Sequence, residues 1–343
     1  MTSIDPPSRP ASPWQLFYGA AHRARQLWYQ RRAAELPRPV ISVGNLHWGG
    51  SGKTPMTAAI AAHLRDRGAF VAILSRGYAS RGEGVRLVSR GEGPLLGPGL
   101  AGDEPVLLAG SLPGVAVVVC GDRHHAGEHA LARLDPKPDL FLLDDGFSHL
   151  RLRRDLDILV FPASDPFAGG RLPPGGRLRE PLASSSRAHA AVLTGVVEEG
   201  DGERLALALR PFGFEGPGFE APSHFESPRI LPSSEVLPDH AKVLLVSAIA
   251  RPENFSQVVR DLGFEIVEHL SFRDHHAYPD ESLQKIQETY EASGAQTILT
   301  TSKDRVKLLG RLEVPLAELP LRAEPEEAFF RWLDQEVDQL SSR

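Results

Sequence analysis

A glycine-rich turn that ends in Lys53-Thr54 constrains the fold of this chain more than any other feature. The turn reads Gly49-Gly50-Ser51-Gly52-Lys53-Thr54, and it lies between an apolar run at residues 40–43 and a helical pattern at residues 54–67. Backbone N–H groups in such a turn, together with the N-terminus of the following helix, bind an anion. The pattern therefore predicts a nucleotide-binding fold in which Lys53 contacts the β- and γ-phosphates and Thr54 ligates Mg²⁺.

A second signal is an apolar segment that ends in two carboxylates, Leu140-Phe141-Leu142-Leu143-Asp144-Asp145. An acidic residue at the tip of such a strand is where nucleotide-hydrolysing folds hold the metal, directly or through water. Paired acidic residues alone are common in turns. Beside the phosphate loop, however, they favour a Mg-nucleotide site in which Asp144 and Asp145 join Thr54 as metal ligands.

Short apolar segments alternate with helical patterns along most of the chain, which indicates a mostly parallel sheet with helices on both faces. We expect an α/β protein of the P-loop NTPase type, with a smaller second α/β domain and an N-terminal amphipathic helix. The predicted segments are residues 1–38 (N-terminal helix), 39–205 (nucleotide-binding domain), 206–232 (extended linker), 233–322 (smaller domain) and 323–343 (C-terminal helix). Long loops are predicted at 76–102 and 162–182, and such loops commonly serve as lids or binding loops.

Residues 14–35 form a basic and aromatic helical pattern. Leu16, Phe17, Ala20, Ala21, Ala24, Leu27 and Trp28 share one apolar side, and His22, Arg23, Gln26 and Gln30 lie opposite. Residues 1–38 carry a net charge of about +4, although the whole chain carries −6. The segment therefore predicts a helix that binds an anionic membrane surface. The alternative is a helix that packs on the domain and leaves a solvated basic edge.

The bulk composition restricts the compartment and the partners. The acidic balance argues against nucleic-acid binding, which requires a basic field. The single cysteine, Cys120, lies in an apolar run and fits a buried thiol in a reducing compartment. No apolar run reaches the ~18 residues of a membrane-spanning helix, and the N-terminus lacks the apolar core of a signal peptide. We therefore expect the protein to stay in the cytoplasm.

Phosphoryl transfer to a hydroxyl group also requires a residue that accepts the hydroxyl proton. Asp103 and Glu104, in the loop segment Gly102-Asp103-Glu104-Pro105, are candidates by residue type. The segment Asp274-His275-His276 supplies a candidate orienting imidazole. As bare sequence, residues of these types are more often part of a solvated surface than catalytic.

With these motifs in order, the chain resembles the tetraacyldisaccharide 4'-kinases, the lipid A 4'-kinases of lipopolysaccharide synthesis in Gram-negative bacteria. The phosphate loop matches from Val43 to Pro55, including the absent first glycine, where His47 stands. The motifs that follow are Ser75-Arg76-Gly77-Tyr78, Gly102-Asp103-Glu104-Pro105, Asp144-Asp145-Gly146-Phe147-Ser148-His149, Leu178-Arg179-Glu180-Pro181, Ile249-Ala250-Arg251-Pro252-Glu253-Asn254-Phe255, Asp274-His275-His276 and Thr300-Thr301-Ser302-Lys303-Asp304. Four residues depart from the family's usual pattern: Ser148, Ser302 and the pair Ala79-Ser80 after Tyr78.

The resemblance implies two α/β/α domains joined by a two-stranded linker, with ATP and Mg²⁺ bound in the cleft between them. It implies transfer of the γ-phosphoryl group of ATP to the 4'-hydroxyl of a tetraacylated glucosamine disaccharide 1-phosphate. By position, Asp103 would be the general base paired with His275, and Lys53 and Asp145 would act on the phosphates and the metal. The substrate-binding residues implied by the resemblance are Asn45, Arg76, Glu104, His149 and Arg179. It also implies that the N-terminal helix lies at the cytoplasmic face of the inner membrane, and we expect the protein to be a monomer.

Two other classes of function remain as alternatives. A switch ATPase of the partition type shares the Gly-Gly-x-Gly-Lys-Thr pattern, but such proteins carry Lys just before the paired glycines, where this chain has Trp48. A catalytically inactive glycolipid-binding module would keep the fold, but a dead site would be free to lose Lys53, Thr54, Asp103 and Asp145. The kinase interpretation is therefore favoured.

Overall fold

A computed structural model describes residues 4, 13–30, 32–78 and 80–341. The larger domain is built on a nine-stranded sheet in the order β14-β8-β7-β6-β1-β5-β2-β4-β3. Its strands are β1 (Val40–Gly44), β2 (Val71–Ser75), β3 (Arg86–Ser89), β4 (Ala116–Val119), β5 (Leu140–Asp144), β6 (Leu156–Pro162), β7 (Ala190–Gly195), β8 (Gly218–Phe225) and β14 (Leu321–Ala323). Neighbouring strands are parallel except at the two edges, where β3 and β14 pair antiparallel with β4 and β8. This arrangement confirms the predicted mostly parallel α/β sheet.

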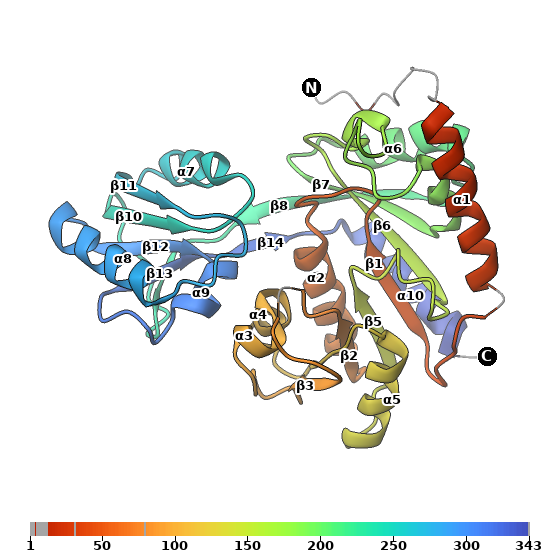
Figure 1. Cartoon of the computed structure of the whole chain (residues 1–343), viewed down its shortest axis with the longest axis horizontal. Helices are drawn as coiled ribbons and strands as arrows, with labels where there is room; N and C mark the ends of the chain where they lie inside the picture. The colour runs from red at the N-terminus through yellow and green to blue at the C-terminus, as the bar shows by residue number, and fades with distance from the viewer. Residues whose placement is uncertain (1–3, 5–12, 31, 79, 342–343) are drawn as a thin grey trace.

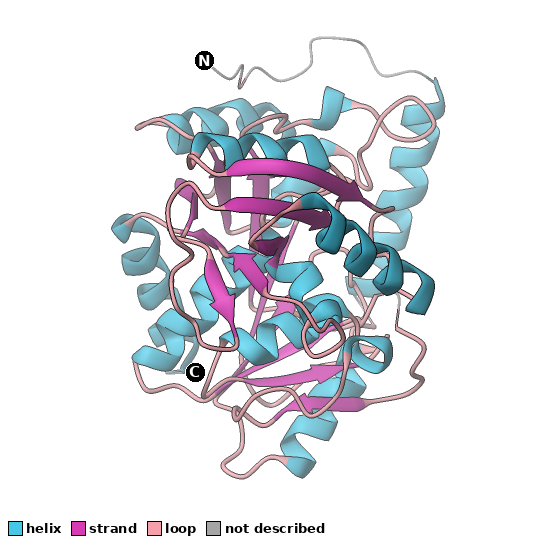
Figure 2. Ribbon diagram, turned by 90° about the vertical axis from the view of Figure 1, so that its left-hand side faces the viewer, coloured by secondary structure: helices cyan, strands magenta, loops and turns pink. Residues whose placement is uncertain are grey.

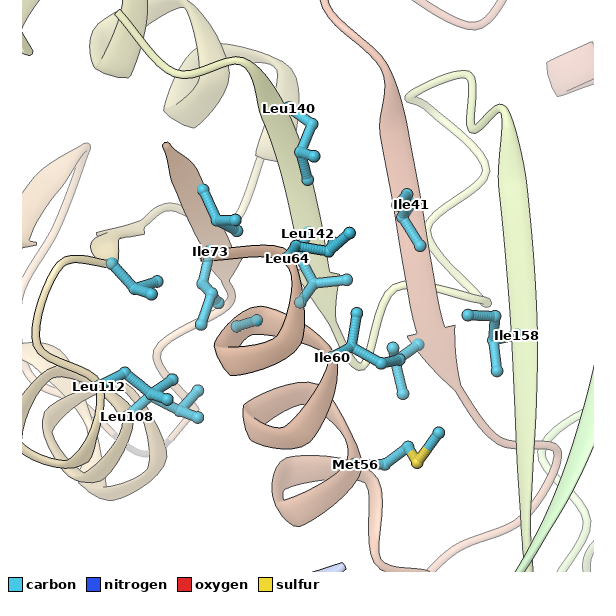
Figure 3. Close-up of a cluster of buried hydrophobic side chains, with 14 of the residues drawn as sticks. Ile41, Met56, Ile60, Leu64, Ile73, Leu108, Leu112, Leu140, Leu142 and Ile158 are labelled. Carbon is cyan, nitrogen blue, oxygen red and sulfur yellow. The ribbon is translucent and has the colours of Figure 1, made fainter. Parts of the chain in front are cut away.

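Helices cover both faces of this sheet because its strands are apolar on both sides. The helices are α2 (Lys53–Asp66), α3 (Pro98–Ala101), α4 (Asp103–Ser111), α5 (Arg123–Arg133), α6 (Asp201–Leu209) and α10 (Glu327–Ser341). Buried side chains of α2, α4 and α10 pack on one face, and those of α5 and α6 pack on the other. Figure 3 shows the first face, where Met56, Ile60 and Leu64 point from α2 toward the strands.

The smaller domain has a five-stranded sheet in the order β11-β10-β12-β13-β9. Its strands are β9 (Arg229–Leu231), β10 (Lys242–Ser247), β11 (Glu265–Ser271), β12 (Thr297–Thr301) and β13 (Leu316–Leu319). Its helices are α7 (Pro252–Asp261), α8 (Asp280–Ser293) and α9 (Ser302–Leu308). In Figure 2 this domain faces the viewer; α7 packs on one face of the sheet, and α8 and α9 pack on the other. A second α/β domain was predicted, and the structure has one.

The chain passes between the domains twice, and Figure 1 shows β8 and β14 side by side at the crossing. The segment 206–232, which the sequence predicts as an extended linker, begins inside α6 and contains β8. Strand β8 continues the large sheet because Phe219 and Ala221 are buried against it, so most of this segment belongs to the larger domain. Helix α10 returns to the larger domain, where the rings of Phe329 and Phe219 meet edge to face at 5.4 Å.

The N-terminal helix α1 (Pro13–Gln30) runs along the larger domain, at the right of Figure 1. Residues 1–3, 5–12 and 31 of the predicted N-terminal segment lie outside the described residues. The predicted loop 76–102 contains β3 and α3, and Asp103, predicted to lie in a loop, begins α4. No helix in the described part of the chain is long and apolar enough to cross a membrane.

Candidate active site

The phosphate loop connects β1 to α2 at the carboxyl end of the sheet. Gly52 has a φ of 77°, and a side chain on it would lie 2.9 Å from the Thr194 hydroxyl, so only glycine fits. The Thr194 hydroxyl donates to the Ser51 carbonyl at 2.9 Å, and the Asn45 amide donates to the Ser51 hydroxyl at 2.9 Å. Lys53 Nζ lies 3.4 Å from the same hydroxyl. The loop is therefore fixed from the sheet side, and Lys53 is held at its mouth.

His47 stands where the strict form of the loop has glycine. Its ring is buried, and its Nδ1 lies 3.4 Å from the Asn45 amide nitrogen. Burial and the nearby charge of Lys53 lower the pKa of His47 to about 4, so the imidazole is neutral at physiological pH. The ring therefore fills space beneath the loop without adding a positive charge.

The two aspartates at the end of β5 have different surroundings. Burial raises the pKa of Asp144 to about 7, and the negative charges of Glu104 and Asp145 act in the same direction. Asp145, which follows the strand with a φ of 52°, lies 3.8 Å from Lys53 Nζ and accepts from Arg179 at 2.9 Å. Burial alone would raise the pKa of Asp145, but Lys53 and Arg179 outweigh it and hold that pKa below its usual range.

A divalent cation fits this end of the sheet. Asp144 is buried beside two other carboxylates, and its charged form gains from a nearby cation. Thr57, one turn after Thr54 on α2, donates to Asp144 Oδ1 at 3.2 Å, which places the start of α2 beside this carboxylate. Carboxylate and hydroxyl oxygens are the ligands that Mg²⁺ prefers. Asp144, Asp145 and Thr54 are thus the residues that would hold the ion.

Asp103 lies in the first turn of α4, and its partners come from the smaller domain. His275 Nδ1 lies 3.3 Å from Asp103 Oδ2, and Lys307 Nζ lies 3.2 Å from the same oxygen. Lys307 also lies 2.8 Å from Asp304, which is fully buried. Burial raises the pKa of Asp103, but the contacts with His275 and Lys307 outweigh it, so the net pKa lies below the ordinary value. The carboxylate is therefore ionised and able to accept a proton at neutral pH.

A second ion pair crosses between the domains beside the first. Lys303 Nζ lies 3.5 Å from Glu104 and 3.8 Å from Asp274, and it contacts His275 Nε2 at 3.3 Å. Glu104 interacts with groups of both domains: it pairs with Lys303 of the smaller domain, and its negative charge also acts on Asp144. The first turn of α4 therefore lies between the two aspartates at the end of β5 and the smaller domain.

The loop that contains Arg179 runs beside the phosphate loop and is hydrogen-bonded to it. The Arg179 N–H donates to the Leu46 carbonyl at 2.7 Å, and the Trp48 N–H donates to the Arg177 carbonyl at 2.8 Å. The guanidinium of Arg179 lies 4.5 Å from the Trp48 ring, over its face. Arg179 therefore connects the phosphate loop with Asp145.

The remaining predicted substrate residues are Asn45, His149 and Arg76. Asn45 is 1% exposed and supports Ser51 from below. His149 is half-buried with no hydrogen bond to Nε2 among the described residues, and burial and Arg123 lower its pKa to about 4. Arg76 is exposed at the end of β2, where its charge acts on Arg123. Contacts of these residues with a substrate stay predictions. Of the departing pair Ala79-Ser80, Ala79 lies outside the described residues.

The sequence analysis did not single out four residues that the fold brings to the site: Thr57, Arg123, Glu180 and Lys307. For Glu180 it did not predict the contacts that make this residue an anchor for its neighbours. Lys307 follows Lys303 by four residues on α9, a spacing that places both on one helix face. That spacing was the available signal for Lys307. Glu180 accepts from Arg187 at 2.7 Å and from Ser148 at 2.6 Å, and it lies 3.0 Å from His22 of α1. Ser148, which departs from the family pattern, thus supports the Glu180 anchor.

The chain is similar to known proteins of one family. The family model described as tetraacyldisaccharide-1-P 4'-kinase matches residues 8–338. The tetraacyldisaccharide 4'-kinase of Geobacter sulfurreducens is 42% identical over 305 residues, which cover 86% of this chain and 82% of the relative. That of Pelobacter propionicus is 40% identical, with 87% and 82% covered. A crystal structure of LpxK from Aquifex aeolicus in complex with ATP matches with a TM-score of 0.74 and 34% identity, covering 96% of this chain and 97% of that one. This chain belongs to the tetraacyldisaccharide-1-P 4'-kinase family.

Proposed function

We propose that this protein transfers the γ-phosphoryl group of ATP to the 4'-hydroxyl of a tetraacylated glucosamine disaccharide 1-phosphate, a step of lipid A synthesis. The observation that carries the proposal is the position of α4. Its first turn places Glu104 beside Asp144 and places Asp103 against His275 and Lys307. A proton acceptor thus stands between a phosphate-binding loop and a second domain, as a sugar kinase requires.

The chemistry follows from these positions. The loop amides and Lys53 bind the phosphates, and bound Mg²⁺ would neutralise charge on the transferred group. Asp103 accepts the proton of the 4'-hydroxyl as the hydroxyl oxygen bonds to the γ-phosphorus. The bond between that phosphorus and the bridging oxygen breaks, and ADP leaves. His275 contacts Asp103 from the smaller domain and fixes the orientation of its carboxylate.

The test is transfer of label from γ-labelled ATP to tetraacyldisaccharide 1-phosphate in detergent micelles with Mg²⁺. Wild-type protein should label the lipid, and Lys53→Ala should not. Asp103→Ala should lower kcat by about 10²–10⁴-fold while the protein still binds ATP. Label released only as free phosphate would favour the switch ATPase, and nucleotide binding without any turnover would favour the inactive glycolipid-binding module.

We further propose that α1 attaches the protein to the cytoplasmic face of the inner membrane. The helix turns its polar side inward: His22 is buried against Glu180, and Gln26 donates to Ser184 at 3.1 Å. Its apolar side faces outward, with Phe17 67% and Trp28 50% exposed. A soluble helix shows the opposite arrangement. Arg32 lies over the Trp28 ring at 4.8 Å, so a cation accompanies the exposed apolar side, as anionic lipid head groups require.

Sedimentation with vesicles that contain anionic lipid tests this attachment. Substitution of Phe17, Leu27 and Trp28 by serine should release the protein, because these apolar side chains are exposed on α1. Leu207→Ser is the matched control, since Leu207 is equally exposed on α6. Binding that survives the triple substitution, or that is lost equally in the control, would contradict the proposal.

We propose that the protein acts as a monomer, and light scattering in detergent measures that state.

A further inference from the structure

Helix α5 carries a group of metal-binding residue types that has no part in the proposed phosphoryl transfer. Residues 124–129 read His-His-Ala-Gly-Glu-His. Residues four positions apart are neighbours on a helix surface, so His124 lies beside Glu128. The same spacing places His125 beside His129. Pairs of this kind, one turn apart on a helix, are a common way to present ligands to a metal ion.

The packing of α5 determines which of its sides reaches solvent. A side chain on Gly127 would come within 2.3 Å of Leu36, so the helix lies close to the segment that precedes β1. His125 and Glu128 are exposed, and His124 is half-buried at their border. Figure 1 shows α5 at the lower edge of the larger domain. The side of the helix opposite these ligands consists of the buried residues Arg123, Ala126, Gly127 and Ala130.

The ligand atoms of three of these residues already converge. One such atom from each of His124, His125 and Glu128 lies within 4.8 Å of the other two. His124 Nδ1 and Glu128 Oε2 are 3.5 Å apart, which is longer than an ordinary charge-assisted hydrogen bond. Two ligands that each lie ~2.1 Å from a tetrahedral Zn²⁺ are separated by roughly 3.4 Å. This pair therefore has the spacing of a metal site.

The surroundings leave these ligand atoms accessible to an ion. In the described part of the chain, His125 has no hydrogen bond or ion pair, and its ring centroid lies 6.0 Å from that of His124. Asp122 caps α5 through its carboxylate, which accepts from the His124 N–H at 3.0 Å. This hydrogen bond fixes the first turn through the backbone and does not use the imidazole. Rotation of the exposed His125 and Glu128 side chains is enough to complete the ligand set.

The donor atoms determine which kind of metal fits. Imidazole nitrogen together with carboxylate oxygen suits Zn²⁺ and similar divalent transition metals, whereas Mg²⁺ prefers oxygen ligands. We propose that α5 binds a divalent transition metal of the Zn²⁺ type through His124, His125 and Glu128, with water in the fourth position. The ion would link the first two turns of α5. This site is separate from Asp144 and Asp145, and the inference does not depend on the proposed function.

Calorimetric titration of the whole chain with Zn²⁺ tests the proposal, in excess Mg²⁺ to occupy the oxygen ligands at the end of β5. Wild-type protein should bind one equivalent of Zn²⁺ that His124→Asn and Glu128→Gln bind at least about 10-fold more weakly, because even the loss of an outer-shell partner costs that much. His129→Asn is the matched control, since it removes a histidine of the same helix outside the three converging residues and should bind Zn²⁺ as wild type does. Circular dichroism without metal should be the same for all four proteins, because the substituted side chains are not in the core.

Co²⁺, which replaces Zn²⁺ and absorbs visible light, gives a second measurement. Wild-type protein and His129→Asn should both develop an absorption band that His125→Asn lacks. Equal Zn²⁺ affinity in wild type, His124→Asn and Glu128→Gln would overturn the site. A loss in His129→Asn as large as that in His124→Asn would also overturn the proposed ligand set, because it would assign the ion to a different group of side chains.

Discussion

Lys307→Met should damage catalysis more than its distance from the phosphate loop suggests. Lys307 comes from the smaller domain and lies between two carboxylates, Asp103 at 3.2 Å and Asp304 at 2.8 Å. Its side chain is only 4% exposed. The methionine side chain keeps the volume and removes the charge, so Asp103 loses the contact that crosses from α9. We expect kcat to fall by on the order of 10-fold to 100-fold, because a carboxylate that is no longer held in place rarely meets the hydroxyl in the reactive orientation.

The pH dependence separates this effect from general damage. Burial raises the pKa of Asp103, whereas His275 and Lys307 lower it, so removal of Lys307 raises it. Activity requires the ionised carboxylate and falls as the pH drops through its pKa. The acid limb of kcat/KM should therefore move to higher pH in Lys307→Met and should stay near its wild-type position in Lys307→Arg, which keeps the positive charge.

The free energy of unfolding should also fall in Lys307→Met, because Asp304 is fully buried and would lose the positive charge of Lys307. Breaking a buried ion pair from one side costs ~3–5 kcal/mol, a large part of the ~5–15 kcal/mol that holds a domain folded. The double variant Lys307→Met with Asp304→Asn removes both charges and should recover most of that loss. Its acid limb should nevertheless stay shifted. A wild-type pH profile in the double variant, with normal kcat, would refute the role of Lys307 on Asp103.

Two further predictions concern the metal site and the N-terminal helix. Mg²⁺ affinity, measured calorimetrically at about pH 6 and about pH 8, should be weaker at the lower pH, because burial and the charges of Glu104 and Asp145 raise the pKa of Asp144 to about 7; equal affinities would contradict it. Glu180→Gln should lower the unfolding free energy by ~3–5 kcal/mol at neutral pH, because Arg187 stays buried and loses the carboxylate with which it forms an ion pair. Burial raises the pKa of Glu180, yet His22 and Arg187 hold it below its usual range, so its stabilisation is lost only as the pH falls below ~4.3. Urea titrations should therefore show a large difference in unfolding free energy between wild type and Glu180→Gln at neutral pH and a much smaller difference at acid pH. The same difference at both pH values would exclude this account.

The sequence predicts features that depend on neighbours along the chain. The phosphate loop, the apolar strand before Asp144 and the helix after Lys53 each follow from a few consecutive residues. The contact of Lys307 with Asp103 joins residues more than half the chain apart and depends on how the two domains meet. Strand β3 escaped prediction because it is a short edge strand with half-buried residues such as Arg86. The sequence does not show where the predicted linker 206–232 meets the larger domain, because Phe219 and Ala221 become buried only when β8 pairs with β7 and α10 packs against the sheet.

The candidate site is completed by elements that lie far from the phosphate loop in the sequence. On one side, α9 brings Lys303 and Lys307 to the first turn of α4. On the other, α1 brings His22 to Glu180, and the neighbouring residue Arg179 binds Asp145. The Tyr18 hydroxyl of α1 also lies 3.4 Å from the Arg179 carbonyl. Arg179 therefore contacts both α1 and Asp145, and a displacement of α1 would move the side chain that binds Asp145. Attachment of α1 to a membrane would thus hold Arg179 in place while the lipid acceptor enters, which joins substrate delivery to the geometry of phosphoryl transfer.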